Sequence, residues 1–273
     1  MTSLRHSSAL SFNDFSKKGV NFRILAKCRS QIMFIIGPLL VALIVAHGSP
    51  SGAVALAAFA GGVGGLIFLY APVIRAWKIE AAPAQHNLFG PLHDARLRKL
   101  FVATFLYSTA FGLFEIAVTA FATHAGMPAA AGALLAAASI GSALGALVYG
   151  SHDWRWPVHR QFVAALMLMA FGILLLVPVS NVYFFGVLCV ISCLPMAPVL
   201  AVQSVLTSRI APPSMVAESF TWGGTCLLAG IGVGTTAGGF LVEQGSSSVA
   251  LCAAAMMTAL GAGWAWLVLK NND

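Results

Sequence analysis

Charged side chains are scarce in this chain, since Asp, Glu, Lys and Arg make up 8% of its residues against roughly 25% in a typical soluble domain. Hydrophobic residues make up 59% of its 273 residues. A soluble fold of this length has no interior large enough to bury so much apolar surface. The composition therefore excludes an ordinary soluble domain and predicts an all-α, polytopic membrane bundle.

The apolar segments also lack the residues of several kinds of site. All seven histidines lie in loops or at predicted helix ends, and no aspartate lies inside an apolar segment. An intramembrane haem or metalloprotease site needs such ligands, so we expect neither a metal nor a cofactor. The sequence contains no phosphate-binding loop and no GxSxG elbow. We therefore expect that the chain is not an enzyme.

Positive charge is absent from one side of the predicted loops. Polar interruptions delimit eight apolar helices, at 31–47, 53–74, 99–122, 129–150, 161–179, 182–206, 216–242 and 248–269. All fifteen Lys and Arg residues fall in alternate connections, and none lies in the other set, around 47–50, 123–128, 180–181 and 243–247. Positive charge is retained on the cytoplasmic side of short loops. The pattern predicts that both termini are cytoplasmic.

The same charge distribution bears on domains and partners. The net charge of +7 is spread over helix-flanking loops and does not form one patch, which excludes a nucleic-acid partner and favours contact with the lipid bilayer. We expect a cytoplasmic basic segment at 1–30, two transmembrane helices at 31–74, a central cytoplasmic loop at 75–98 and a six-helix unit at 99–270. Segment 1–30 has no apolar core of a signal peptide and is either a helix on the inner leaflet or a mobile tail.

Small residues and prolines indicate how the helices pack. Three faces with glycine at every fourth position allow close approach of helix backbones. They are Gly61/Gly65, Gly141/Gly145 and Gly230/Gly234/Gly238. Pro195 and Pro198 are expected to bend the helix predicted at 182–206, because each removes a backbone donor.

Two acidic residues fall inside predicted spans. Glu115 lies about two turns from the outer end of its helix, where an acid costs ~2.5–3.5 kcal/mol on insertion scales. It is either a proton-coupling or cation-contacting group, or a protonated acid hydrogen-bonded across helices. Glu218 follows Ser214, a predicted N-cap, so the helix dipole alone accounts for an acid there. Trp222, one turn further on, and Gln203 are candidates for the lining of a substrate cavity.

Several stretches together resemble the major facilitator superfamily, with most similarity to bacterial sugar- or drug-efflux members. They are QIMFIIGPLL from Gln31 (with Gly37 and Pro38), Gly90-Pro-Leu, AGALLAAASIGSALG from Ala131 (with Gly141 and Gly145) and AESFTW from Ala217. The run from Gly145 to Gly150, followed by Asp153 and Arg155, is similar to the cytoplasmic loop motif of the family's second half.

This resemblance implies a function and a departure from the family pattern. The eight helices match family helices five to twelve, so the chain covers the C-terminal two-thirds of a twelve-helix transporter of the inner membrane. Such transporters bind a small-molecule substrate between two six-helix halves. We expect proton-coupled efflux, with Glu115, Glu218, Trp222, Gln203 and Gln31 as pathway candidates. Gln31 stands where relatives often carry an acid.

The first four family helices have no counterpart, so half of the expected cavity wall is missing. The chain is then a shortened transporter, or it pairs with a second chain that supplies the missing helices. The alternative is a non-transporting remnant or a membrane partner of an intact transporter.

Overall fold

The structure, a computed structural model, describes residues 50–70, 90–152 and 154–269. Within these ranges the chain is helical and contains no strand. In chain order the elements are α2 (Pro50–Tyr70), α4 (Gly90–His93), α5 (Ala95–His124), α6 (Ala130–Ser151), α7 (Val158–Leu176), α8 (Val182–Ser192), α9 (Met196–Ile210), the 3-10 turn η1 (Pro213–Met215), α10 (Val216–Gln244) and α11 (Ser247–Leu269). The predicted segment 1–30, the first predicted helix at 31–47 and most of the 75–98 loop lie outside the described residues.

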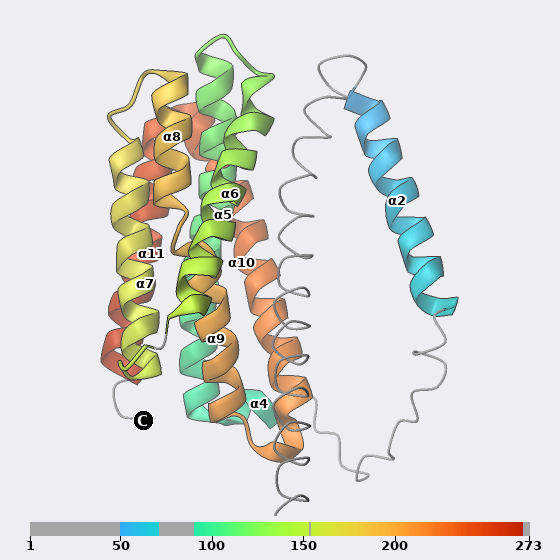
Figure 1. Ribbon diagram of the computed structural model, residues 1–273, viewed down its shortest axis with the longest axis vertical. Helices are drawn as coiled ribbons and strands as arrows, with labels where there is room; N and C mark the ends of the chain where they lie inside the picture. The colour runs from blue at the N-terminus through green and yellow to red at the C-terminus, as the bar shows by residue number, and fades with distance from the viewer. Residues whose placement is uncertain (1–49, 71–89, 153, 270–273) are drawn as a thin grey trace, which may run out of the picture.

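Six segments of the described chain are long and apolar enough to cross a membrane, where about 20 apolar residues are needed. They are α5, α6, α7, the α8–α9 pair, α10 and α11, and they pack along the long axis of the molecule in Figure 1. These are the six helices predicted between residues 99 and 269. The prediction of an all-α, multi-pass membrane bundle is confirmed.

The helix α5 is the centre of the bundle. Its most extensive contacts are with α10 and α11, and it also packs against α6 and α9. Leu100, Tyr107, Ala110 and Ala117 on this helix are fully buried. The helix begins at Ala95, four residues before the predicted start, because the carboxylate of Asp94 accepts hydrogen bonds from the backbone N–H groups of the first turn.

Glycines let two pairs of helices approach until their backbones touch. A Cβ added at Gly234 of α10 would overlap the carbonyl oxygen of Thr109 on α5, and one at Gly112 would overlap the backbone of α10 in return. A Cβ at Gly141 of α6 would likewise overlap the carbonyl oxygen of Val190 on α8. The predicted close-packing faces on α6 and α10 are therefore present in the bundle.

The predicted packing face on the second span is not found. α2 lies apart from the six-helix bundle in Figure 1, and an added Cβ at Gly61 or Gly65 would meet no atom within 4 Å in the described part of the chain. Large side chains of α2 are exposed, including Phe59 at 69% and Ile67 at 67%. Small residues permit close helix contact, but they do not create it without a partner.

The fourth span of the bundle is interrupted where the two prolines predicted a bend. α8 ends at Ser192 and α9 begins at Met196, with a turn between them. Pro195 has no N–H to donate to the carbonyl of Ile191, which instead accepts from the N–H of Leu194 at 3.3 Å. The break therefore follows directly from the missing backbone donor.

All described Lys and Arg residues lie at one end of the bundle. Arg96, Arg98 and Lys99 are in the first turns of α5, Arg155 and Arg160 are in the α6–α7 connection and the start of α7, and Arg209 is at the end of α9. In Figure 1 this is the lower end, where α4 also lies. The connections at the opposite end carry no Lys or Arg among the described residues.

Candidate functional site

A buried polar pair joins three helices in the half of the bundle nearer the basic end. The hydroxyl of Tyr107 on α5 donates a hydrogen bond to Oε1 of Gln203 on α9. Tyr107 is fully buried and Gln203 is 8% exposed. A Cβ added at Gly223 of α10 would lie 3.5 Å from Nε2 of Gln203, so the carboxamide also touches the third helix. A buried polar group is costly unless it is hydrogen-bonded, and this bond satisfies the hydroxyl of Tyr107 and Oε1 of Gln203.

The surroundings of the pair fix its geometry. The ring of Tyr107 meets Phe111 edge-to-face at 5.4 Å and Phe162 of α7 at 6.1 Å. The hydroxyl of Thr207 donates to the backbone carbonyl of Gln203 at 2.9 Å. Gln203 was predicted to line a substrate cavity. In the structure its carboxamide is engaged with Tyr107, a residue that the sequence had not singled out.

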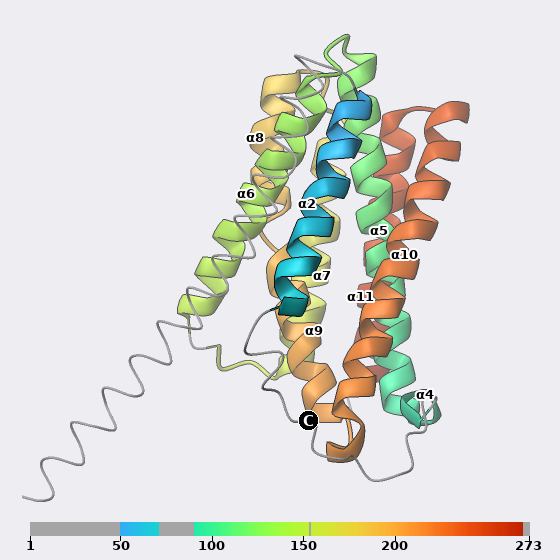
Figure 2. The ribbon, with the colours of Figure 1, turned by 90° about the vertical axis from the view of Figure 1, so that its right-hand side faces the viewer.

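Glu115 occupies a different position from the one expected of a buried acid. Its side chain is exposed on the bundle, and no hydrogen bond joins it to another described residue. The described residues therefore provide no partner for the alternative of an acid hydrogen-bonded across helices, which stays a prediction. Around the axis of α5, Glu115 lies between Gly112, which contacts α10, and Phe111, which packs against the hydrophobic core. Figure 2 shows α5 between α6 and α10, with α2 in front.

The structure does not bring the pathway candidates into one site. Glu115 lies eight residues beyond Tyr107 on α5, or about 12 Å along the helix. Trp222 packs instead near Phe101 and Ala211, at the basic end. Gln203 on α9 and Trp222 on α10 thus both lie towards the basic end of α5, and Glu115 is separate from them.

Glu218 lies in the first turn of α10 and is half-buried. An acid in this turn is favoured by the helix dipole, as predicted. The predicted N-cap, Ser214, is wrong, because η1 (Pro213–Met215) precedes the helix and Met215 occupies the cap position with no side-chain hydrogen bond. The fixed φ angles of the two prolines start a tighter turn before α10 begins.

The remaining predicted motif residues have mixed outcomes. Gln31, Gly37, Pro38 and Asp153 lie outside the described residues. Gly141 and Gly145 are both at close helix contacts, and a Cβ at Gly145 would overlap the carbonyl oxygen of Leu194 at the helix break. Gly150 has no atom within 4 Å of an added Cβ, so it makes no close approach, and Arg155 is exposed.

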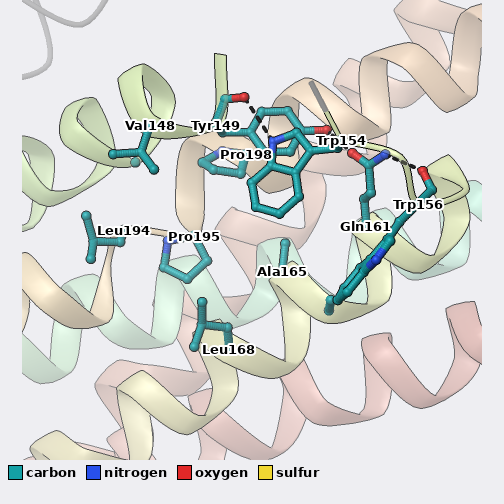
Figure 3. A pocket seen from close by; sticks show the side chains of 12 residues that line it. Val148, Tyr149, Trp154, Trp156, Gln161, Ala165, Leu168, Leu194, Pro195 and Pro198 are labelled. Atoms are coloured by element: carbon teal, nitrogen blue, oxygen red, sulfur yellow. Dashed lines mark hydrogen bonds between the residues drawn. The ribbon is translucent and has the colours of Figure 1, made fainter. Parts of the chain in front are cut away.

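An apolar cavity of about 360 Å³ lies beside this helix break, between the end of α6, the start of α7 and the turn between α8 and α9. Figure 3 shows Trp154, Tyr149, Gln161 and Trp156 grouped at its polar edge. The hydroxyl of Tyr149 donates to Oε1 of Gln161, whose Nε2 donates to the carbonyl of Trp156 at 2.6 Å. The indole N–H of Trp154 donates to the carbonyl of Tyr149 at 3.0 Å. The sequence signal for this feature is the pair of tryptophans next to Arg155.

Within the described ranges, no group of three His, Cys, Asp or Glu side chains is gathered at metal-binding distance. Comparison of the chain with models of known protein families and with curated protein sequences gives no match.

Proposed function

We propose that this chain is a secondary transporter of the major facilitator type that moves a small solute across the cytoplasmic membrane. The observation that carries the proposal is the exposed side chain of Glu115 within a membrane-length helix. An acid that faces lipid costs ~2.5–3.5 kcal/mol or more near the bilayer centre. The cost is avoided where the helix face meets water or another protein surface. Such a face is typical of a solute or proton pathway.

The interrupted fourth span supports the same proposal. Transporters commonly use discontinuous helices near the membrane midplane, where irregular backbone is tolerated if protein covers it or it lines a cavity. The turn between α8 and α9 is covered by α6 through Gly145. In this proposal Glu115 exchanges a proton with the pathway, and the Tyr107–Gln203 pair holds α9 against α5.

The orientation of the bundle is part of the proposal. We infer that the end with the basic residues faces the cytoplasm, as do both termini, because short loops retain positive charge on that side. Alkaline phosphatase fused after His124, Asn181 or Gln244 is expected to be active outside the cell, and the same enzyme fused after Arg155 is expected to be inactive. Activity at Arg155 would contradict this orientation.

Transport itself is tested with the full chain in proteoliposomes under an imposed pH gradient. The solutes are a panel of radiolabelled sugars and fluorescent cationic dyes. If Glu115 couples protons to transport, Glu115→Gln is expected to reduce gradient-driven transport at least tenfold. The matched control is Glu243→Gln, which neutralises an exposed acid at the far end of α10 and is expected to leave the rate unchanged. Equal rates for wild type and Glu115→Gln would remove Glu115 from the mechanism.

A second candidate function is that of a membrane partner that does not itself transport. The observation in its favour is the separation of α2 from the bundle, which leaves residues such as Phe59 and Ile67 exposed. Transport of no solute in the panel, together with co-purification of this chain with a protein of four basic-flanked helices from a neighbouring reading frame, would favour this candidate.

A further inference from the structure

The cavity beside the helix break has an apolar lining, and two arginines, Arg155 and Arg160, neighbour its lining residues Trp154, Trp156 and Gln161 in sequence. Its volume of about 360 Å³ is within the range of ~300–1,000 Å³ that is typical of small-molecule sites. Leu168, Leu194, Pro195 and Pro198 form part of the apolar lining, and Figure 3 shows Leu194 and Pro195 on the side opposite Gln161. Such a lining suits hydrocarbon and offers few partners to a polar solute.

The mouth of the cavity carries aromatic groups of the kind found at membrane interfaces. Trp154 and Trp156 are 43% and 56% exposed, and Trp154 stacks on Tyr149 at 5.6 Å. Tryptophan and tyrosine are enriched at the headgroup level of bilayers, where one part of the ring system is apolar and another is wet. The hydrogen bonds among Tyr149, Gln161 and Trp156 hold this edge in place.

Two arginines lie next to these aromatic residues in the sequence. Arg155 lies between the two tryptophans in sequence, and Arg160 is in the first turn of α7. Both side chains are exposed, and neither forms an ion pair with a described residue. Asp153, in the α6–α7 connection, lies outside the described residues, and the sequence from 152 to 160 carries two arginines against this one acid. The charge at the mouth therefore complements an anion.

We propose that this cavity binds one anionic phospholipid, with an acyl chain in the apolar interior and the headgroup phosphate at Arg155 and Arg160. The two tryptophans then lie beside the glycerol and ester region. The cavity opens on the side of the bundle where Val148 and Leu168 are 64% and 59% exposed, so a lipid enters it directly from the membrane. This binding does not depend on whether the chain transports a solute.

The test uses the full chain in lipid nanodiscs that contain a trace of phosphatidylglycerol or phosphatidylcholine with a photoactivatable diazirine on the acyl chain. After irradiation, mass spectrometry measures the crosslinking yield on peptides that cover residues 145–168. We expect phosphatidylglycerol to label these peptides about tenfold more than phosphatidylcholine, because each basic residue near the headgroups strengthens the attraction to anionic lipid.

Two kinds of variant separate headgroup recognition from occupation of the cavity. Arg155→Gln with Arg160→Gln is expected to abolish the preference for phosphatidylglycerol. The control, Arg96→Gln with Arg209→Gln, removes the same charge from exposed positions at the same end and is expected to retain it. Ala165→Phe fills the cavity and is expected to reduce labelling by both lipids at least fivefold.

Three outcomes would overturn the proposal. Equal labelling of the wild type by both lipids would show that the cavity does not recognise the headgroup. An equal loss of preference in both double variants would assign the effect to the overall charge of that end. Unchanged labelling in Ala165→Phe would place the acyl chain elsewhere, and should this variant fail to fold, the charge variants at exposed positions still decide.

Discussion

The backbone contact between α5 and α10 offers a direct test of the packing of the bundle. Gly234 of α10 lies against Thr109 and Gly112 of α5, and its added Cβ would come within 3.1 Å of the Cα of Gly112 and overlap the carbonyl oxygen of Thr109. Because the obstructing atoms are backbone, no rotation of a side chain relieves the overlap. Gly234→Ala must push the two helices apart over the length of their contact. Overpacking of this kind costs about 1–3 kcal/mol.

The same helix provides a matched control for Gly234→Ala. Gly232 has no atom within 4 Å of its added Cβ, so Gly232→Ala adds the same methyl group to open space. Alanine favours the helix over glycine by ~0.5–1 kcal/mol, so this control is expected to be neutral or slightly stabilising. With a shift of ~2–4 °C per kcal/mol, the midpoint Tm of Gly234→Ala is expected to fall by roughly 2–12 °C.

The assay for the two alanine variants is thermal unfolding of the purified chain in detergent, followed by tryptophan fluorescence and by size-exclusion chromatography of heated samples. The reasoning requires a lower Tm for Gly234→Ala than for both the wild type and Gly232→Ala. Equal Tm values for the two variants would show that α5 and α10 do not meet backbone to backbone at Gly234.

Further predictions concern buried polarity and helix capping. Tyr107→Phe leaves Oε1 of Gln203 without its donor and is expected to lower stability by about 1–3 kcal/mol, whereas the double variant with Gln203→Leu is expected to recover part of that loss in the same unfolding assay. The side chain of Asn181 caps α8 by accepting from the N–H groups of the next turn at 3.0 and 3.1 Å, so Asn181→Ala is expected to cost about 0.5–2 kcal/mol. Ser180→Ala, at the exposed neighbouring position, is the control for the cap and should leave Tm unchanged.

The order and extent of the helices were predictable from the sequence. Apolar runs of membrane length and basic connections on one side were sufficient to place the six spans from α5 to α11. The break near Pro195 was predictable as a bend, because the loss of a backbone donor is a local property. The start of α5 was missed by four residues, although Asp94 before an apolar run is the usual signature of an N-cap.

The face to which each candidate side chain points was not predictable in the same way. α5 is apolar on nearly all sides, so its sequence does not indicate which face meets α10 and which is left open at Glu115. The Tyr107–Gln203 bond joins residues that are 96 positions apart. A single sequence holds no record of such a pairing, and polar residues in the middle of a span indicate only that some partner is needed.

In the broken fourth span, contacts with neighbouring helices set the directions of α8 and α9, which the apolar pattern of the sequence does not determine. Above the break, α8 is held by α6 at Gly141 and by α7, where the hydroxyl of Ser192 donates to the carbonyl of Gly172 at 2.7 Å. Below it, α9 is held against α5 and α10 through Gln203. In an unbroken helix the direction of one half would fix that of the other. Because Pro195 uncouples the two, each half takes the direction that its own partners require, and the turn between them leaves room for the apolar cavity beside α6 and α7.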